Sequence, residues 1–479
     1  MNRQFISKRE QRTAGGGARH AAWRAARNSA LRLRRIAVPI AALLATASTI
    51  VVSGNALAAT PNPYNAKITY WFFGEGDVPG INAWLQQRVK LYAKLHPQVH
   101  INLIPQAGAT LSSTFALAAQ SRTGPTIDTQ YATLGVLAPL WEGQVSPISD
   151  FVPKSQTNHW LNTSENTYKG QIAAMPIYLI GTPLAWNKQL FKKAGLNPNV
   201  GPATWAQFLN DCKVLKAHGI TPLGGGDKDG YFGAWMLSVF GKGLFNSTAQ
   251  VTSAVAAPGT AETAFLSKLT TFYTTFASIV RDGYFNSNIA SLTLGASVSL
   301  FPEKKVAMEI STDANVLSWA KILGAQNIGV ERPPSAWTQG ALSSDYDVTQ
   351  STSEFITSWS QDKPAQAAFL AWLHQPANLV ALNKETGAFP ADNRFPSKDI
   401  SSPLARTLDE LDTSGKSVWL ENFLPPQVDT NADLPAGELI FSASGTPRQA
   451  AGVWETQLRE WRTLQPTQDK QFEQWAKAS

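Results

Sequence analysis

Residues 67–80 read Lys67-Ile-Thr-Tyr-Trp-Phe-Phe73 and then Gly74-Glu-Gly-Asp-Val-Pro-Gly80. The first seven residues are mainly β-branched and aromatic, and glycines bound the second seven, which predicts a strand that ends in a loop. Apolar residues between Ile81 and Leu95 follow on one helical stripe, and Pro97 ends the pattern. The stretch therefore predicts a strand, a loop and a helix in succession.

A second strand is predicted directly after this helix, because Val99, Ile101 and Leu103 alternate with polar residues. The three elements form a βαβ unit, whose strands we expect to be parallel and whose crossover we expect to be right-handed. The loop 74–80 leaves the carboxyl end of the first strand. In open α/β sheets ligands bind at that edge.

Helices and strands continue to alternate farther along the chain, which predicts an α/β fold. The residues from Thr204 to Gln207 have the spacing of a helix-capping box. The other predicted elements are helices at 110–122 and 134–140, a strand at 126–131 and a helix that opens at Pro364. Two stretches, 247–260 and 425–435, have the composition of linkers.

The N-terminal segment has the pattern of a secretory signal. Residues 1–35 carry ten Lys and Arg against the single acid Glu10, an apolar run follows at 36–45, and small residues end in Ala56-Leu-Ala58. We expect cleavage before Ala59 and a soluble periplasmic protein, without a cysteine that could carry a lipid. The alternative is an uncleaved membrane anchor, although a stable span needs about 20 apolar residues.

The positive charge of the chain belongs to this segment. The formal net charge is +7, and residues 1–58 contribute ten basic side chains and one acidic one, so the remainder carries −2. Nucleic acid is therefore not an expected partner. The remaining length exceeds what one hydrophobic core usually serves, which favours two lobes.

The single cysteine, Cys212, excludes an intrachain disulfide. It shares a helical stripe with Phe208 and Leu215, so we expect a buried, unreactive thiol.

Motifs for catalysis and metal binding are missing. The sequence has no phosphate-binding G-x-x-x-x-G-K-[ST] loop and no G-x-S-x-G elbow, and Pro97 breaks the spacing of His96 and His100. We expect no catalytic residue, no cofactor and no metal. Tryptophan is abundant, with 16 in the chain. Aromatic planes bind the C–H faces of sugars and carboxylates bind their hydroxyl rim, so we expect two or three of these rings to contact a ligand.

The strongest likeness to a known family lies at Lys169-Gly-Gln-Ile-Ala-Ala-Met-Pro-Ile-Tyr178 and at Leu184-Ala-Trp-Asn-Lys-Gln-Leu-Phe-Lys-Lys-Ala-Gly-Leu196. These segments resemble the family-1 extracellular solute-binding proteins, in which a Gly-x-x-Tyr-x-x-Pro strand leads into Tyr-Asn-Lys-x-x-Phe-x-x-Ala-Gly. Residues 141–148, 202–222, 304–311 and 386–390 are similar to the family as well. The chain departs from the pattern at Ala173 and Trp186, where the family usually has Tyr. It also lacks a Trp after Ile310.

The resemblance implies a two-lobe receptor of the maltose-binding-protein type, each lobe a mostly parallel sheet flanked by helices. It implies a first lobe of residues 59–179 and 333–386 and a second lobe of 180–332 and 387–479, joined by crossovers at 177–182, 330–334 and 382–388. The ligand would be a mono- or oligosaccharide held in the interlobe cleft, which closes by a hinge motion. The partners would be the permease subunits of an ABC importer, and the receptor would be a monomer.

Seven residues are candidates for ligand contact. Five of them follow or end predicted strands of the first lobe or follow the return to it. Of the other two, one follows a predicted strand at 306–310 and the other resembles the position of an aromatic sugar platform in the family's second lobe. The candidates are Glu75, Asp77, Tyr131, Trp235, Asp313, Asp345 and Tyr346. Each also has a structural interpretation, as a polar turn, a helix cap or a packing residue.

Other classes of function stay open. An exported glycoside hydrolase or lyase would turn over a sugar with a pair of carboxyl groups, as Asp345 and Asp347 could supply. A surface carbohydrate-binding module would bind polymer without closing. A receptor of this family could also take a solute other than a sugar.

Overall fold

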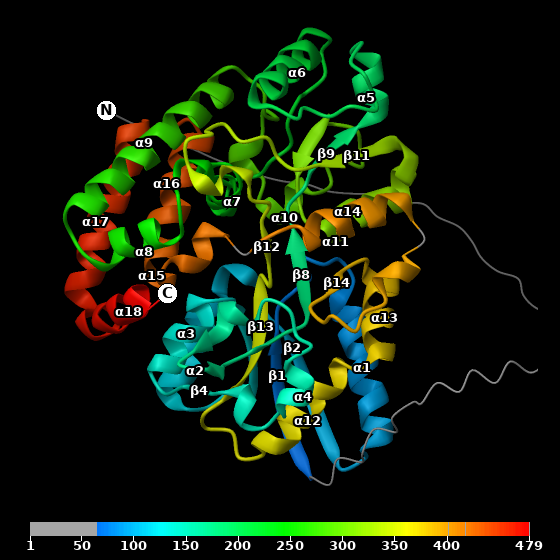
Figure 1. The fold of residues 1–479 in the computed structure, drawn as a ribbon, viewed down its shortest axis with the longest axis vertical. Coiled ribbons are helices and arrows are strands. Elements are labelled where there is room, and N and C mark those ends of the chain that lie inside the picture. Colours follow the sequence, from blue (N-terminus) through cyan, green and yellow to red (C-terminus); the bar gives the residue numbers. More distant parts are fainter. Residues whose placement is uncertain (1–64, 401, 417, 479) are drawn as a thin grey trace, which may run out of the picture. The chain divides into compact units, whose positions relative to one another are not determined.

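The computed structural model describes residues 65–400, 402–416 and 418–478, which belong to one compact unit, Ala59–Ser479 (Figure 1). The predicted export signal and its cleavage point at Ala59 lie outside the described residues. Within the described ranges, no helix combines the length and the apolar character that crossing a membrane requires.

The predicted βαβ unit opens the described chain. Strand β1 (Ala66–Phe72) and strand β2 (Val99–Pro105) pair in parallel over their whole length. Helix α1 (Ile81–Leu95) connects them and buries its apolar stripe, including Trp84 and Tyr92. Gly80 precedes the helix with φ 90°, a left-handed conformation that glycine adopts without steric cost. The predicted order of strand, helix and strand and the parallel pairing of the strands are confirmed.

The first lobe is built on a six-stranded sheet in the order β2-β1-β3-β13-β4, with β7 (Met175–Pro176) also paired to β13. Strand β3 (Ile127–Tyr131) runs parallel to β1, whereas β13 (Thr352–Thr357) is antiparallel to β3 and to β4 (Val145–Ser146). Figure 1 shows α2 and α3 on one side of this sheet and α1 and α13 on the other. The bounds of the helices are α2 (Leu111–Ser121), α3 (Leu134–Trp141), α12 (Lys363–Leu373) and α13 (Pro376–Thr386). The helices expected at 110–122, at 134–140 and from Pro364 are therefore confirmed.

A small three-stranded sheet, the middle sheet, lies where the chain passes from one lobe to the other. Strand β8 (Tyr178–Gly181) pairs with β12 (Val348–Thr349) and with β14 (Phe389–Pro390). Three segments that are far apart in sequence thus meet at one place, and β8 continues directly into the second lobe.

The second lobe contains a three-stranded sheet in the order β10-β9-β11. Strand β9 (Leu184–Asn187) is antiparallel to both β10 (Met308–Ile310) and β11 (Ile328–Glu331). The expectation of a mostly parallel sheet therefore applies to β1, β2 and β3 but not to these strands. The reason lies in the topology. Strand β9 carries the chain from β8 into the second lobe, and β10 and β11 on either side of it both run in the opposite direction.

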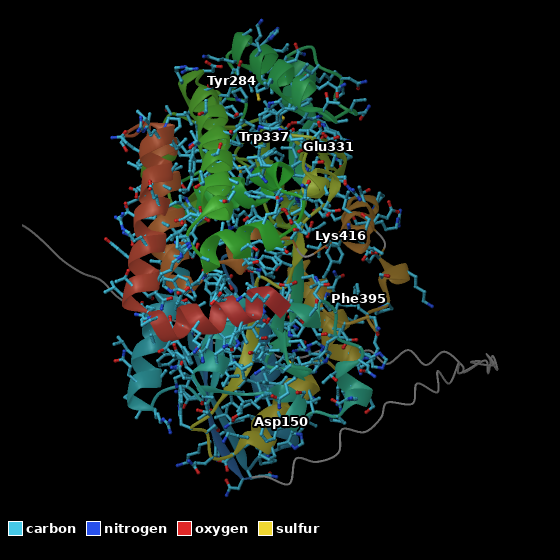
Figure 2. All side chains as sticks on the ribbon, turned by 60° about the vertical axis from the view of Figure 1, so that its left-hand side comes forward. Asp150, Tyr284, Glu331, Trp337, Phe395 and Lys416 are labelled. Carbon is cyan, nitrogen blue, oxygen red and sulfur yellow. The ribbon has the colours of Figure 1, made fainter. Side chains whose placement is uncertain are left out.

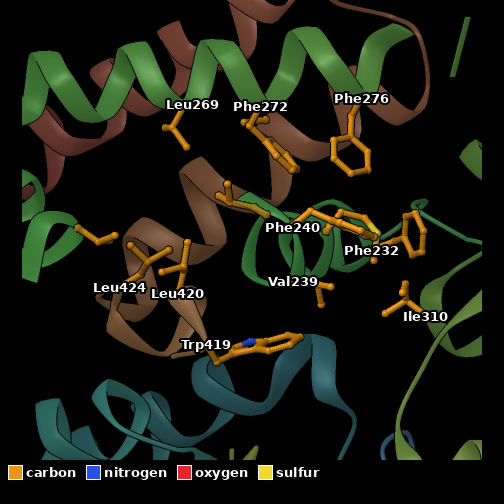
Figure 3. Close-up of a cluster of buried hydrophobic side chains, with 14 of the residues drawn as sticks. Phe232, Val239, Phe240, Leu269, Phe272, Phe276, Ile310, Trp419, Leu420 and Leu424 are labelled. Carbon is orange, nitrogen blue, oxygen red and sulfur yellow. The ribbon is translucent and has the colours of Figure 1, made fainter. Parts of the chain in front are cut away.

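A helical layer completes the second lobe. Its largest core packs aromatic side chains from α7 and α9 against the segment at 419–424, as Figure 3 shows with Phe240, Phe272 and Trp419. The helices of this layer are α7 (Tyr231–Val239), α8 (Ala249–Ala256), α9 (Thr260–Arg281), α15 (Pro426–Val428), α16 (Leu434–Phe441), α17 (Pro447–Leu464) and α18 (Pro466–Ala478).

Both stretches expected to be linkers belong to this layer, so that expectation is wrong. Residues 247–260 contain α8, which buries Val251 and Val255 in the core. Residues 425–435 form α15, a π-helical turn (Asp429–Asp433) and the start of α16. Proline is compatible with the first turn of a helix, where no backbone N–H is needed, so the prolines here begin helices and do not mark a flexible segment.

Helix α6 (Trp205–Ala217) has the predicted capping box. The Thr204 side chain accepts from the backbone of Gln207, and the Gln207 side chain accepts from the Thr204 backbone. Cys212 lies on its apolar face and is fully buried, as expected. The remaining elements are α4 (Lys154–Thr157), α5 (Lys188–Lys193), α10 (Leu294–Ser297), α11 (Asp313–Leu323), α14 (Pro403–Thr413), β5 (Thr167–Tyr168) and β6 (Gln171–Ile172). Figure 2 shows the side chains that clothe this framework.

Candidate functional site

A cavity of about 270 Å³ lies among residues of the first sheet's loops, the middle sheet and the helical layer. Its size is close to the lower end of the range for small-molecule sites. Its lining residues are Phe73, Gly76, Asp77, Gly108, Tyr131, Ile180, Asp229, Tyr231, Trp235, Thr293, Leu294, Gly295, Val298, Ser311, Asn315, Thr349, Ser351, Trp419, Glu421 and Asn422.

One wall comes from the carboxyl ends of the parallel strands. Phe73 and Asp77 follow β1, Gly108 follows β2, and Tyr131 is the last residue of β3. Parallel strands bring their carboxyl ends to one edge of a sheet, which is why these residues meet there. The ring of Phe73 packs edge-on against Tyr131, with 5.9 Å between ring centroids.

Gly108 makes this close packing possible. A Cβ atom at this position would lie 3.0 Å from the Phe73 ring and 3.1 Å from the Tyr131 hydroxyl. A larger residue would therefore require both side chains to shift.

The opposite wall comes from the helical layer. Trp235 of α7 is half-buried and its ring stands perpendicular to that of Trp419, at 88° and 5.3 Å between centroids. Trp419 is buried at the margin of the aromatic core, as Figure 3 shows. The core therefore fixes Trp419, and Trp419 in turn orients Trp235 at the cavity.

Asp77 is the central acid of the first wall. It is 7% exposed, and its Oδ2 accepts hydrogen bonds from the Ser351 hydroxyl at 2.6 Å and from the Tyr178 hydroxyl at 3.2 Å. Burial raises the pKa of its carboxyl above the ordinary value, and these two hydrogen bonds oppose the shift. Asp77 is thus held in place by neutral donors.

Glu421 is the central acid of the opposite wall. It belongs to the 3₁₀ turn Leu420–Phe423, and its Oε2 accepts from the indole N–H of Trp419 at 3.0 Å. Burial raises the pKa of Glu421 to about 7, the indole N–H opposes the shift, and the charge of Asp77 adds to it. The negative charge of Asp77 therefore disfavours ionisation of Glu421.

Asp229, Tyr131 and Tyr231 complete the polar lining of the cavity. Oδ1 of Asp229 accepts from the backbone N–H of Leu294 at 3.2 Å, and burial raises the pKa of its carboxyl. Burial also raises the pKa of Tyr131, as do the nearby Tyr231, Asp77 and Glu421. Burial raises the pKa of Tyr231 too, so both tyrosine hydroxyls are neutral near neutral pH.

Hydrogen bonds cross between the walls. The Thr312 hydroxyl donates to the Asp77 carbonyl at 2.7 Å, and the Tyr231 hydroxyl donates to the Gly108 carbonyl at 3.4 Å. Asn422 donates to the Thr349 hydroxyl at 2.9 Å. A smaller cavity of about 30 Å³ adjoins the first, shares Tyr131, Glu421 and Asn422 with it, and is also lined by Asp429 of the π-helical turn.

Three of the seven residues singled out from the sequence line the cavity together. They are Asp77, Tyr131 and Trp235. Their ligand contacts stay a prediction, but the structure brings them to one site from three separate parts of the chain.

Glu75 and Asp345 lie away from the cavity lining and have other contacts. The Glu75 carboxylate accepts from the backbone N–H groups of Gly80 at 2.7 Å and Asn82 at 3.0 Å, so it caps the N-terminus of α1. Asp345 forms an ion pair with Lys416 at 2.8 Å, and Figure 2 labels this lysine.

Asp313 and Tyr346 are buried beside the middle sheet. Oδ2 of Asp313 accepts from the backbone N–H of Gly181, the last residue of β8. The Tyr346 hydroxyl and the Asp412 carboxylate lie against the same glycine, where a Cβ atom would meet them at 2.6 Å and 2.2 Å. These side chains thus pack the strand that leads from one lobe to the other and do not line the cavity.

Several lining residues were missed by sequence reasoning. Tyr231 lies four residues before Trp235, at the start of the same helix. Residues four apart share one face of a helix, and this spacing could have identified Tyr231 as a candidate. Trp419 and Glu421 stand two residues apart, just before the stretch that was mistaken for a linker. Among the described residues, no group of three or more His, Cys, Asp or Glu side chains is arranged to hold a metal ion.

Comparison with known proteins agrees with this architecture. The family model described as bacterial extracellular solute-binding protein matches residues 76–379, more than half of the chain. A Brucella abortus (strain 2308) protein, named only for binding, is 28% identical over 195 residues, which are 38% of this chain and 44% of that protein. The match thus spans less than half of the relative's length.

Solved structures share the fold. A chitin oligosaccharide binding protein superposes with a TM-score of 0.73 at 18% identity, over 82% of this chain and 98% of the other. An ABC transporter solute-binding protein from Thermotoga lettingae, bound with α-D-tagatose, superposes with a TM-score of 0.66 at 17% identity, over 82% and 99%. At such identities the likeness establishes the two-lobe α/β fold of periplasmic binding proteins.

Proposed function

The chain belongs to the bacterial extracellular solute-binding protein family, and from this premise we propose that it is a receptor that binds a small sugar. The observation that carries the proposal is the lining of the cavity, where five aromatic rings stand beside three carboxyl groups. Aromatic faces pack against the C–H faces of a sugar, and carboxylates accept from its hydroxyls. Chitin oligosaccharide and tagatose, named for two proteins of the same fold, are ligands of this chemistry.

The residues that we propose for ligand contact are those that line the cavity. Trp235 would form the platform for a sugar ring, with Tyr131 opposite, and Asp77 would accept from hydroxyls. We add Glu421 and Tyr231 to this set, because they complete the same cavity.

We propose that ligand contacts to both walls favour closure of the lobes. The first lobe would comprise residues 59–179 and 333–386, and the second 180–332 and 387–479. The meeting of β8, β12 and β14 in one small sheet supports a hinge at this place. Binding needs no covalent step, so the receptor would act without catalysis, as an exported monomer that delivers its ligand to the permease of an ABC importer.

A screen by thermal shift tests the proposal. Purified protein lacking residues 1–58 would be heated with mono- and oligosaccharides, polyols, amino acids and polyamines, and calorimetry would follow each hit. A sugar should raise the Tm, because a ligand that binds only the folded state adds about 2.7 kcal/mol at a hundredfold excess over its Kd.

Three results would contradict the proposal. A rise in Tm with non-sugar solutes alone would retain the receptor but change its ligand. Appearance of new sugar products, followed by chromatography of the same samples, would favour a hydrolase or lyase. Binding of polymer without any effect of short sugars would instead indicate a surface carbohydrate-binding module.

A further inference from the structure

The charged side chains that line the cavity are all acidic. Asp77, Asp229 and Glu421 line it, and its lining contains no Lys, Arg or His. None of the three forms an ion pair with another described residue. We propose that the preferred ligand is a cationic sugar, one that carries a protonated amine. The inference rests on the proposed function and names the class of sugar that the site selects.

Elsewhere the same fold supplies cations to buried acids. Lys242 pairs with the buried Asp347, and Arg394 reaches the buried Asp392 at 2.6 Å. Removing a partner from such a pair is costly, because an uncompensated charge is left in a medium of low dielectric. At the cavity the charge of Lys228 lowers the pKa of Asp229, but no Lys, Arg or His lines the cavity or forms an ion pair with Asp77 or Glu421 among the described residues, so a cationic ligand would provide this charge.

Two further buried acids, Asp429 and Asp433, interact electrostatically with Glu421. Burial raises the pKa of Asp429 and of Asp433 well above the ordinary range, and the charge of Glu421 raises both further. Asp429 lines the smaller cavity that adjoins the first through Glu421. A cation bound in the cavity would favour the ionised form of these carboxyls as well as that of Glu421.

A second observation concerns hydrogen-bond acceptors. Asn315 lines the cavity at 2% exposure, its amide nitrogen donates to the Ser311 hydroxyl at 3.0 Å, and its Oδ1 has no partner within the described structure. The hydrogen bonds to Asp77 and Glu421 engage Oδ2 and Oε2 respectively. The site thus has an excess of acceptors, and an ammonium group with its three donors suits it better than a hydroxyl with one.

The aromatic walls favour the same ligand. Phe73, Tyr131, Tyr231, Trp235 and Trp419 line the cavity. A cation placed over the face of such a ring is attracted by its quadrupole, and the attraction strengthens when water is excluded. One set of rings can therefore hold both the C–H face of the sugar and its charged amine.

Proton linkage gives the proposal a signature. Burial raises the pKa of Glu421 to about 7, so this carboxyl is partly protonated in the free protein near neutral pH. A bound ammonium favours the ionised form and lowers that pKa, so binding releases protons. Affinity for the amine should then rise with pH up to about 7, as long as the amine itself stays protonated, whereas a neutral sugar lacks this charge-driven rise.

The experiment compares matched sugars by calorimetry at about pH 6.5. Glucose, glucosamine and N-acetylglucosamine differ only in the substituent at C2. Cellobiose, the glucosamine β-1,4 dimer and its N,N′-diacetyl form differ only in the C2 substituent of each of their two rings. For the size that binds, we expect the amino form to bind at least about tenfold more tightly than the hydroxyl and acetamido forms. We expect this preference to shrink at about 0.5 M salt, because salt screens charge.

Two substitutions separate the local charge from the overall charge. Glu421→Gln should reduce the preference for the amino form several-fold and remove the proton release. Glu410→Gln, an exposed acid on α14, makes the same change in net charge and should leave the preference as it is. A Tm of Glu421→Gln near that of the parent would show that the variant is folded. If the variant does not fold, the dependence of the parent's affinity for the amino form on salt and pH tests the proposal instead.

The outcomes distinguish the two proposals. Equal or tighter binding of the hydroxyl or acetamido form would overturn the cationic ligand and leave the sugar receptor standing. Failure of all six sugars and of the wider screen would overturn the sugar receptor and this inference with it.

Discussion

At the scale of the residue, two tryptophans with similar sequence surroundings have different environments. Trp235 is half-buried at the cavity, where Trp419 packs against it edge to face. Trp372 is 8% exposed and packs in the first lobe, with its ring 5.1 Å from that of Tyr92 and stacked at 6.4 Å on Phe369. Substitution of each should therefore affect a different property.

We expect Trp235→Ala to weaken sugar binding by about 1–3 kcal/mol, because aromatic anchors in interfaces contribute on that scale. Trp372→Ala should instead lower the free energy of unfolding by about 3–5 kcal/mol, because it leaves a cavity in a packed core. Calorimetry with the best sugar and urea unfolding of both variants would measure the two effects. Parent-like affinity of Trp235→Ala would mean that the ligand lies elsewhere.

Cys212 allows a second prediction at this scale. Its thiol is fully buried in α6, and burial raises its pKa far above the ordinary value. The thiolate is the reactive form, so labelling by a thiol reagent should be slow in the folded protein and fast after denaturation. Mass spectrometry at timed intervals would follow the reaction, and rapid labelling of the native protein would show that α6 opens readily.

At the scale of the element, Asp392 joins α12 to the segment after β14. Its Oδ2 lies 2.9 Å from Nδ1 of His374, which ends α12, and Arg394 donates to both of its oxygens at 2.9 Å and 2.6 Å. Burial alone would raise the pKa of Asp392, but the bonds from Arg394 and His374 outweigh it and lower the pKa to about 2. The ionised form is therefore the one that the fold stabilises.

The direction of this shift sets a pH dependence. A carboxyl whose pKa is lowered in the folded state contributes stability that is present above its unfolded pKa of about 3.9 and is lost as pH falls towards 2. Asp392→Asn should lower the free energy of unfolding by about 2 kcal/mol at pH 7, as a shift of this size implies. Urea unfolding of parent and variant between pH 7 and about 2.5 would measure the difference. A gap that stays constant with pH would contradict the assignment.

The elements themselves could largely be predicted from the sequence. The alternation from Val99 to Leu103, the stripe of α1 and the box at Thr204 are local patterns, and each produced the expected element. Where the expectation is wrong, the cause is tertiary. The proline- and aspartate-rich composition of residues 425–435 predicts a linker, but packing of Val428 and Ala432 in the helical core makes the segment helical.

At the scale of the whole molecule, the middle sheet is where the two lobes connect. Its strands β8, β12 and β14 come from three distant segments, and β8 continues into the second lobe through Thr182. A short sheet of this kind can absorb a rotation of one part of the molecule against another. The buried cluster around Phe272 also includes Phe115 of α2 and Leu137 of α3, so part of this core spans both lobes.

We expect a saturating sugar to reduce the radius of gyration without changing the content of helix and strand. Small-angle scattering and far-UV circular dichroism, with and without the sugar identified by the screen, would measure the two quantities. Identical scattering profiles at saturation would favour a rigid carbohydrate-binding module over a hinged receptor.

The sequence by itself determined the α/β class, the βαβ unit, the buried thiol of Cys212 and the resemblance that the family model bears out, because periodicity and short motifs are properties of neighbouring residues. The tertiary structure decided the site. It brought Asp77, Tyr131 and Trp235 together with Glu421, which the sequence had not singled out, and it gave Glu75 to the end of a helix. The physical reason is that a cavity depends on which distant segments pack together. A local sequence pattern does not show which distant segment will form the other wall of the cavity.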